Sequence, residues 1–355
     1  MTSAFDPIDL GGKRLANRIA MAPMTRSRAY GPGASPTAAM TTYYTQRAGA
    51  GLLITEGAQP SVIGQGYTNT PGLHSAEQVE AWREVTDAVH REGSVIYAQL
   101  LHTGRIGHPS LLPDGMFPVG PSPVAASGQV FTQDGMRDFV TPVELTEAAI
   151  TETIEDFARA ARNAIAAGFD GVELHGANGY LIHQFLSTNA NRRTDGWGGS
   201  VQGRIRFAVE LARAVADAIG AHRVGLRVSP AGVFNDITED GYRDTYLALV
   251  EALEPIDLAY LHVMESGDRE LTSALRKSFS GTFILNPHTP GSMTGLDDLA
   301  LIEDGTADII SFGALFLANP DLPARLAAGG PFNTPDRATY YGGDERGYTD
   351  YPTLG

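Results

Sequence analysis

The stretch Gly171-Val172-Glu173-Leu174-His175-Gly176-Ala177-Asn178-Gly179-Tyr180 combines a short apolar run with a polar loop. The run 171–174 is typical of a buried strand. Where it stops, His175, Asn178 and Tyr180 offer two hydrogen-bond donors and a phenol from one short segment. The two glycines of the loop permit a tight turn. The stretch therefore predicts a strand that ends in an active-site loop.

The same rhythm of short apolar runs and longer amphipathic segments repeats along the chain, and this alternation is typical of βα units. Eight such units close into a barrel, so we expect a single (β/α)8 domain over residues 1–355. The expected strands lie near Ile19–Ala22, Leu52–Thr55, Val95–Gln99, Gly171–Leu174, Val224–Val228, Leu258–Val263, Thr282–Leu285 and Ile309–Phe312. The expected helices include Ala76–His90, Thr146–Ala167, Gln202–Ile219, Asp244–Leu253 and Leu296–Glu303.

Two long insertions interrupt this rhythm after expected strand ends. The first, Pro109–Pro142, follows the third strand and is rich in Gly, Pro and Ser. The second, Glu265–Ser280, follows the sixth strand. Catalytic residues of such barrels lie at the carboxyl ends of the strands. We therefore predict that both insertions overhang the active site as lids.

The composition excludes several classes of function. The chain has 355 residues, 43% of them hydrophobic, and its 26 Lys and Arg against 41 Asp and Glu give a formal net charge of −15. This acidic balance argues against nucleic-acid or anionic-membrane partners and favours small-molecule partners. Cysteine is absent, which excludes thiolate chemistry, and no HExxH-like spacing predicts a metal site. Because residues 1–7 lack signal-peptide features and no apolar run is long enough to span a membrane, we expect a cytoplasmic protein.

Other expected strand ends carry polar groups that would converge on the same mouth of the barrel. Thr25, Gln99 and Arg227 combine a hydroxyl, an amide and a guanidinium, which suit the edge of a flat, heteroatom-rich ring such as a flavin. From these residues alone, a non-catalytic binding protein stays open as an alternative. A hydrolase that uses paired carboxylates is another. Its candidates near strand ends are Glu56, Glu173 and Glu265.

Several motifs, in order along nearly the whole chain, resemble the Old Yellow Enzyme family. They are Ala22-Pro23-Met24-Thr25-Arg26, Gln99-Leu100 followed by His102-Thr103-Gly104-Arg105, the segment His175 to Tyr180, Leu226-Arg227-Val228-Ser229-Pro230, Phe312-Gly313 followed by Leu317-Ala318-Asn319-Pro320, Tyr340-Tyr341-Gly342-Gly343, and Gly347-Tyr348-Thr349-Asp350-Tyr351-Pro352. The likeness is greatest to bacterial ene-reductases of the N-ethylmaleimide reductase and xenobiotic reductase types. It implies a barrel flavoenzyme that reduces alkenes conjugated with a carbonyl or nitro group.

The resemblance implies a cofactor role for residues at the mouth of the barrel. Thr25 and Gln99 would hydrogen-bond the pyrimidine side of the flavin, and Arg227 would stabilise the negative charge of the reduced ring. Gly57 would let the backbone approach the ring closely. The other residues expected around the cofactor are Pro23, Met24, Asn286, His288, Gly313 and Ala314.

The resemblance also implies the catalytic residues. His175 and Asn178 would donate hydrogen bonds to the carbonyl or nitro oxygen of the substrate, while hydride passes from flavin N5 to the β-carbon. Tyr180 would deliver a proton to the α-carbon. The same likeness leaves open whether the chemistry runs as a net reduction, an isomerisation or a desaturation.

The chain departs from the family where the phosphate of FMN is normally bound. There the family has a glycine-rich turn and an arginine directly after the Phe-Gly of the eighth strand. This chain has Asn286-Pro287-His288-Thr289-Pro290-Gly291, whose two prolines lack the N–H that a phosphate needs, and Ala314 in place of the arginine.

Two cofactors stay open because of this departure, with weak or absent cofactor binding as a third alternative. FMN is the first expectation, with His288, Thr289 or Lys277 as a substitute contact to the phosphate, and NAD(P)H would then reduce it in the same pocket. A deazaflavin of the coenzyme F-420 type is the alternative, because its tail is bulkier and its phosphate is a singly charged diester. A separate enzyme would then supply it in the reduced form.

Further residues near expected strand ends have a structural role as readily as a functional one. Three of the polar members, His102, Arg105 and His108, are expected either to shape a loop or to contact a ligand, whereas His262 and Glu265 are expected to fix the lid after the sixth strand. The aromatic members are expected to line the substrate pocket or to pack in the core or lid. The group consists of His102, Arg105, His108, His262, Glu265, Tyr30, Tyr67 and Phe234.

Overall fold

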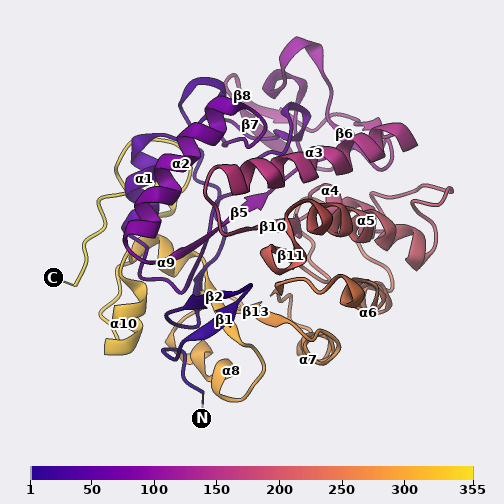
Figure 1. The fold of residues 1–355 in the computed structure, drawn as a ribbon. Helices are drawn as coiled ribbons and strands as arrows, with labels where there is room; N and C mark the ends of the chain where they lie inside the picture. Colours follow the sequence, from indigo (N-terminus) through magenta and orange to yellow (C-terminus); the bar gives the residue numbers. More distant parts are fainter. Residues whose placement is uncertain (1, 355) are drawn as a thin grey trace.

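The computed structural model of the protein describes residues 2–354 and contains a closed barrel of eight parallel strands (Figure 1). The strands follow one another around the barrel in chain order, as the βα rhythm predicts. They are β3 (Ile19–Met21), β4 (Leu52–Ile54), β5 (Val95–Leu100), β10 (Gly171–Gly176), β11 (Val224–Val228), β12 (Tyr260–Met264), β13 (Thr282–Asn286) and β14 (Ile309–Phe312). All eight predicted strands are thus confirmed, with ends shifted by one or two residues.

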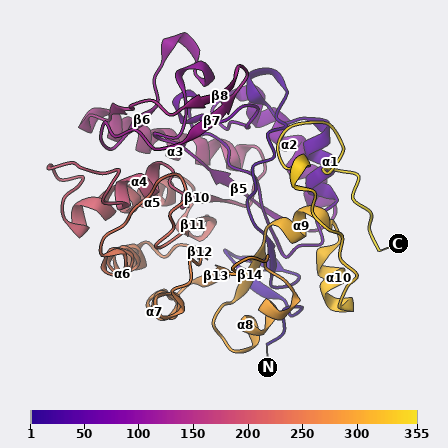
Figure 2. The same ribbon diagram turned by 180° about the vertical axis from the view of Figure 1, so that it is seen from behind.

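Helices surround the barrel, as the view from behind also shows (Figure 2). The three longest pack one side against barrel strands and begin at a side-chain cap, which is Ser75, Thr146 or Ser200. They are α1 (Ala38–Thr45), α2 (Ala76–Arg91), α3 (Glu147–Ala166), α4 (Leu181–Leu186), α5 (Val201–Ile219), α6 (Tyr242–Leu253), α7 (Arg269–Ser278), α8 (Ala300–Glu303), α9 (Ala314–Ala318) and α10 (Leu322–Ala328). The five predicted helices correspond to α2, α3, α5, α6 and α8, the last together with the 3-10 turn Leu296–Leu299 that precedes it.

A short hairpin closes the amino-terminal end of the barrel. Its strands β1 (Ile8–Leu10) and β2 (Lys13–Leu15) pair antiparallel, and Leu10 and Leu15 pack in one cluster with Tyr97 and Tyr260 from the barrel interior. Gly11, at the tip of the hairpin, has φ 56°, and a Cβ there would lie 2.1 Å from a backbone oxygen. This end is filled with apolar side chains, so we look for a ligand site at the opposite end.

The predicted insertion after the third barrel strand is confirmed, but the one after the sixth is wrong. Residues 109–142 contain no barrel helix among the described residues and form the hairpin β7 (Gln129–Thr132) and β8 (Gly135–Asp138), with β6 (Val119–Gly120) pairing to β9 (Val143–Glu144). Residues 265–280 instead hold α7, the ordinary barrel helix of this unit, which buries Leu271 and Leu275 one turn apart. The region after the sixth strand is therefore not a lid.

The carboxyl-terminal segment is fastened to the barrel by buried arginines. Arg26 donates hydrogen bonds to the carbonyl oxygens of Tyr340 and Gly347, and its guanidinium lies 5.1 Å and 5.0 Å from the ring centroids of Tyr43 and Tyr348. Those two rings stack at 4.3 Å between centroids. Because Arg26 directly follows Thr25, these contacts also fix the end of the first barrel strand.

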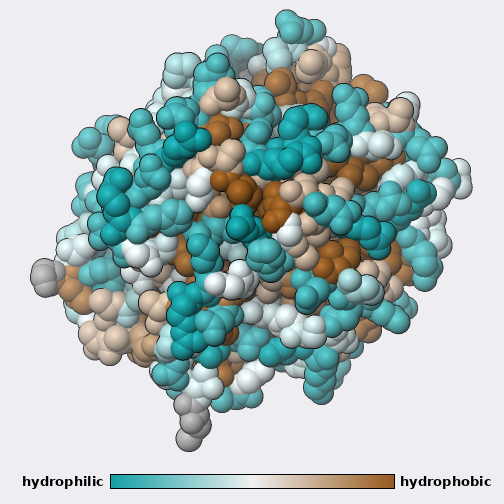
Figure 3. Space-filling model, in the orientation of Figure 1, coloured by the Kyte–Doolittle hydropathy of each residue, from teal (hydrophilic) through white to brown (hydrophobic). Residues whose placement is uncertain are grey.

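The surface seen in Figure 3 is mostly hydrophilic, with apolar residues in separate small areas. This agrees with the formal net charge of −15. No helix within residues 2–354 is long and apolar enough to cross a membrane.

Candidate active site

A cavity of about 290 Å³ lies at the carboxyl ends of the barrel strands, where the sequence predicted the site. Most of the predicted site residues meet there, including those on the first, third, fourth, fifth and eighth strands of the barrel. Its walls are formed by Pro23, Met24, Thr25, Gln99, Leu101, His175, Asn178, Tyr180, Arg227, Phe234, Gly313, Ala314, Leu317, Tyr340 and Tyr341.

A network inside the barrel orients Gln99 at the wall of the cavity. The Glu173 carboxylate accepts a hydrogen bond from Gln99 Nε2 at 2.8 Å, and on its other oxygen from His262 Nδ1 at 2.8 Å and the Tyr260 hydroxyl at 3.1 Å. The hydroxyl of Ser311 lies 2.8 Å from the other nitrogen of His262. Because the amide nitrogen of Gln99 is committed to Glu173, the amide oxygen is the atom left to accept a hydrogen bond from a ligand.

The charges in this network are fixed by burial and by the neighbours. Burial alone would raise the pKa of Glu173, but His262, Arg227 and Gln99 outweigh it and hold the pKa below its ordinary value. Burial lowers the pKa of His262 despite the nearby carboxylate, so that this histidine is neutral and donates from Nδ1. Glu173 is therefore the negative charge that compensates Arg227 in the barrel interior.

Arg227 presents a buried donor to the cavity. One of its terminal nitrogens donates to Asn286 Oδ1 at 3.3 Å, whereas its Nε has no hydrogen-bond partner within residues 2–354. The side chain is 4% exposed. Because a buried donor without a partner is costly, its presence in a cavity wall indicates that a ligand completes it.

His175, near the end of β10, and Asn178, on the loop that follows, line the same cavity. The Nδ1 atom of His175 accepts a hydrogen bond from the Ala177 backbone at 3.4 Å, which leaves the proton on Nε2. Burial, with further contributions from Arg227 and the neighbouring histidines, holds the pKa of His175 well below its ordinary value of 6.5. His175 is therefore a neutral hydrogen-bond donor at neutral pH.

Tyr180 is a buried phenol paired with a second phenol. Its hydroxyl lies 3.0 Å from that of Tyr67, and the ring meets that of His175 edge-on at 5.0 Å. Burial raises the pKa of Tyr180 well above its ordinary value of 10.0, and the contact with Tyr67 raises it further. Tyr180 thus keeps its proton at neutral pH and is suited to be a general acid.

Three residues predicted around the cofactor, Gly57, Asn286 and His288, are not among the described residues that line this cavity. Gly57 packs against Leu101, which a Cβ at Gly57 would approach to 2.5 Å. Asn286 lies behind Arg227 and acts on it through a hydrogen bond. The His288 side chain is exposed, and its backbone N–H already donates to the Glu265 carboxylate at 3.1 Å.

The residues for which the sequence left a structural role open fall into three groups: residues that line a cavity, a residue that shapes its rim, and residues with internal contacts. Phe234 lines the cavity, and Tyr67 and Tyr30 line a neighbouring one. Arg105 donates to loop carbonyls, including that of Asp236 at 2.7 Å, and so shapes the rim. The remaining members, which make only internal contacts such as caps and networks, are His102, His108, His262 and Glu265.

The carboxylates considered for a hydrolase are engaged in networks of their own. Glu56 is bonded to Tyr44 and the Arg26 backbone, and burial raises its pKa to about 7. Glu265 pairs with Arg269, and Glu173 with His262. None of the three is among the described residues that line the cavity. The described residues also contain no cluster of His, Asp or Glu arranged to hold a metal ion.

The chain matches the model of the NADH:flavin oxidoreductase / NADH oxidase family over residues 3–333. The chain belongs to this family, that of the Old Yellow Enzymes. A probable flavin mononucleotide-dependent alkene reductase of Leishmania infantum is 42% identical over 98% of this chain and 96% of its own length. This membership makes the protein a flavin-dependent alkene reductase.

Solved structures of the family share the whole fold. Morphinone reductase in complex with tetrahydroNAD is 41% identical, with a TM-score of 0.94 over 100% of this chain and 98% of its own. The Old Yellow Enzyme homologue from Zymomonas mobilis is 38% identical, with a TM-score of 0.95 over 99% of this chain and 100% of its own. The eight-stranded barrel and its helices are therefore those of the Old Yellow Enzymes.

The cavity of this Old Yellow Enzyme fits the edge of a flavin. Arg227 offers an unpartnered donor, Gln99 an amide oxygen as acceptor, and Thr25 a hydroxyl that can serve as either. The pyrimidine edge of a flavin carries carbonyl acceptors on both sides of one N–H donor, so the sets are complementary. These three residues would hold the ring edge.

Sequence reasoning missed several residues that line the cavity. Tyr340 and Tyr341 come from the fastened carboxyl-terminal segment, which was quoted as a family motif without a role. Leu317 comes from α9 and Leu101 from the end of β5. Apolar residues next to a strand end carry no signal of their own, because most such residues pack in the core.

Proposed function

We propose that this enzyme reduces a carbon–carbon double bond conjugated with a carbonyl or nitro group, with His175, Asn178 and Tyr180 as its catalytic residues. One observation carries this assignment: a neutral histidine and a protonated phenol share a cavity with Gln99 and Arg227, which suit a flavin edge. When bound, a reduced flavin supplies the hydride that is added to the β-carbon.

The residues of the chain do the rest of the chemistry. His175 Nε2–H and the Asn178 amide bind the substrate oxygen and draw electron density from the alkene, which makes the β-carbon electrophilic. Tyr180 holds a proton at its hydroxyl and delivers it to the α-carbon. The neighbouring Tyr67 hydroxyl, 3.0 Å away, is placed to pass a proton back to Tyr180. Hydride and proton together account for the two hydrogens gained by the alkene.

The substrate class follows from a second cavity beside the first. This space of about 780 Å³ shares Tyr180, Phe234 and Tyr341 with the first cavity and is walled by Phe131 on β7. We infer a substrate with a bulky apolar body beyond the conjugated carbonyl. The name of one structural relative, morphinone reductase, points the same way.

The Phe131→Ser variant tests the substrate class. The Phe131 side chain is 60% exposed on the hairpin, so the change removes apolar surface from the second cavity and spares the core. We expect KM for a polycyclic enone to rise about fivefold and KM for cyclohexenone to change less than about twofold. An equal rise for both would contradict the inference.

FMN reduced by NAD(P)H is the first candidate for the cofactor, because the family and the Leishmania relative use flavin. A deazaflavin is the second candidate, and one observation favours it. Arg227, at the ring edge, is the one cation among the described residues that line the cavity, whereas the wall formed by α9 is Ala314 and Leu317. A phosphate monoester there would lack its usual charged partner.

A titration of the apo-protein decides between the two cofactors. FMN and an oxidised deazaflavin are added separately while absorbance and fluorescence are followed, with NADPH added afterwards. Tight FMN binding with NADPH-dependent bleaching identifies FMN. Weak FMN binding beside tight deazaflavin binding identifies the deazaflavin, and the variant Ala314→Arg should then strengthen FMN binding about tenfold. Reduction of a nitroalkene or enone by the loaded protein tests the proposed reaction itself.

A further inference from the structure

The loop that carries Asn178 and Tyr180 has a backbone that needs support. Asn178 has φ 56° and Gly179 has φ 76°, both in the left-handed region that ordinary residues avoid. Such a conformation persists only where its surroundings hold it. Side chains from α4 and from the segment after β11 bond to this backbone; they are Ser229, His183, Asn235 and Gln184.

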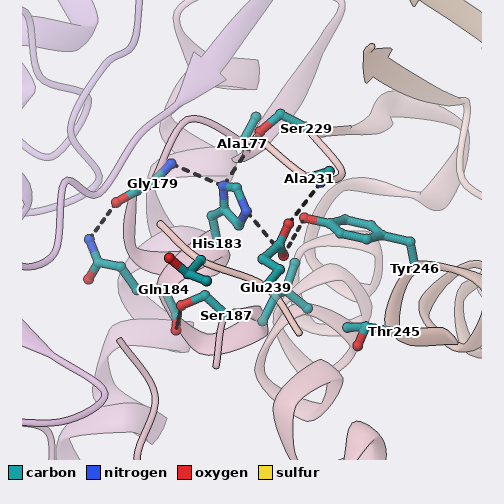
Figure 4. Close-up of polar contacts among 12 residues, drawn as sticks. Ala177, Gly179, His183, Gln184, Ser187, Ser229, Ala231, Glu239, Thr245 and Tyr246 are labelled. Carbon is teal, nitrogen blue, oxygen red and sulfur yellow. Dashed lines mark hydrogen bonds and ion pairs between the residues drawn. The ribbon is translucent and has the colours of Figure 1, made fainter. Parts of the chain in front are cut away.

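One of these bonds ends on the imidazole of His183, and another ends on Ser229, whose hydroxyl lies beside that imidazole (Figure 4). The Gly179 N–H donates to His183 Nδ1 at 3.0 Å. The Asn178 N–H donates to Ser229 Oγ at 3.0 Å, and Ser229 Oγ lies 3.5 Å from the same His183 nitrogen. Because Nδ1 accepts these bonds, the proton of neutral His183 must be on Nε2.

The proton-bearing side of His183 faces a buried carboxylate. His183 Nε2 lies 3.2 Å from Glu239 Oε1, in a contact that lacks the alignment of a full hydrogen bond, and the two side chains are 0% and 3% exposed. Glu239 also accepts from the Tyr246 hydroxyl at 3.0 Å and from the Ala231 N–H at 3.0 Å. Polar N–H and O–H groups therefore face Glu239 from α4, from α6 and from its own segment (Figure 4).

We propose that Glu239 and His183 are positioning residues, which hold the Asn178–Gly179 backbone and thereby aim Asn178 and Tyr180 into the cavity. Glu239 fixes the tautomer of His183, and that tautomer accepts the Gly179 N–H. The inference rests on the proposed roles of Asn178 and Tyr180 in alkene reduction.

The arrangement of Ser229, His183 and Glu239 is like that of a hydrolytic triad, but its burial assigns a different role. Ser229 is 1% exposed and is not among the described residues that line the cavity. Its oxygen already accepts the Asn178 N–H. No substrate reaches that hydroxyl, so within the described structure the trio serves the backbone of the loop.

Glu239→Gln should disrupt the support that Glu239 and His183 give the loop, with a minimal change in side-chain shape. An amide NH2 at the position of Oε2 opposes the Ala231 N–H, so the NH2 is expected at the position of Oε1, where it faces His183 Nε2. There it favours the other tautomer of His183 and sets its Nδ1–H against the Gly179 N–H. We expect kcat/KM for an activated alkene to fall about tenfold, with flavin affinity changed less than about twofold. Glu270→Gln is the matched control, because that side chain is 86% exposed in an ion pair with Arg243.

A second variant separates positioning from general stability. In His183→Asn the side-chain oxygen can accept the Gly179 N–H without a tautomer, so kcat/KM should stay within about threefold of the wild type. Glu239→Gln in that background should then add less than about a further twofold loss. Full additivity of the two changes would overturn the proposal, because Glu239 would not act through His183.

Nitrogen NMR of the histidine side chains in the flavin-loaded wild type gives a readout that needs no turnover. The proposal expects His183 neutral with its proton on Nε2, and expects Glu239→Gln to shift it toward Nδ1. A proton on Nδ1 in the wild type would overturn it. If the wild type reduces no activated alkene, the proposed function fails, and the tautomer still decides whether Glu239 and His183 hold the loop.

Discussion

Two buried histidine–carboxylate pairs support the cavity, and they do so differently. The His262–Glu173 pair lies inside the barrel with both residues on strands, and Glu173 bonds directly to the side chain of Gln99 at the cavity wall. The His183–Glu239 pair lies outside the strands, on α4 and on the segment after β11, and its contacts reach the backbone of the catalytic loop. The first pair sets the orientation of a side chain, and the second sets the conformation of a loop.

This difference separates two functions of the site. On the proposed roles, the ring edge of the cofactor would meet side chains rooted in a closed sheet, where register leaves little freedom. The substrate would meet side chains on a loop with left-handed residues, whose position depends on partners from other parts of the chain. We therefore expect changes in the barrel interior to act on cofactor binding, and changes around the loop to act on turnover.

Tyr180→Phe should give the largest effect on the loop side. Without the hydroxyl the α-carbon receives its proton only from solvent, so turnover of an enone should fall about 100-fold. Binding of a phenolic ligand, measured by the change in flavin absorbance, should change less than about threefold. The control is Tyr242→Phe, whose hydroxyl bonds to Asp268 on the outside of the barrel. Lost phenol binding with unchanged turnover would contradict the proton-donor role.

Glu173→Gln should give the next effect, on the cofactor side. The substitution removes the charge that compensates Arg227, and it allows the side-chain amide of Gln99 to rotate by half a turn. Flavin affinity should therefore fall about tenfold, and the free energy of unfolding should fall by about 2 kcal/mol. Flavin titration and thermal unfolding measure the two quantities, with Glu270→Gln as the surface control. If flavin affinity stayed unchanged while kcat alone fell, the separation of the two regions would be wrong.

The same separation explains what could be predicted from the sequence. The strands repeat with a regular apolar pattern, so all eight were located, and Thr25, Gln99 and Arg227 then followed as polar residues at strand ends. The helix α7 was mistaken for a lid because its two buried leucines are surrounded by charged residues. The local pattern of apolar residues was enough to locate the elements whose backbone geometry is regular.

Residues whose role depends on distant partners could not be predicted in this way. Glu239 and His183 are far apart in the sequence and share no local pattern, and only the folded chain brings their atoms to 3.2 Å. His288 was expected at the cofactor because it follows a strand end, but its side chain is exposed and its N–H is bonded to Glu265. The hydrogen-bond partner of a loop residue is a tertiary property, which no spacing rule contains.

The rate of alkene reduction should depend only weakly on pH. The pKa of His175 is well below 6.5 and that of Tyr180 well above 10.0, so His175 stays neutral and Tyr180 stays protonated between pH 6 and pH 9. The rate constant for oxidation of the pre-reduced enzyme by an alkene should therefore vary less than about twofold over this range. Stopped-flow absorbance measures it. A step near pH 6.5 would show that His175 titrates in the free site.

Ser229→Ala should give the smallest effect of the three substitutions, and it tests how much of the loop depends on His183 alone. The change leaves the Asn178 N–H without its acceptor but keeps the hydrogen bond from the Gly179 N–H to His183 Nδ1 at 3.0 Å. Because the remaining partners still hold the loop, turnover should fall only about threefold, with flavin affinity unchanged. Steady-state kinetics beside a flavin titration measure both. If turnover fell as much as in Glu239→Gln, the main support of the loop would be Ser229. The imidazole of His183 would then not determine the position of the loop.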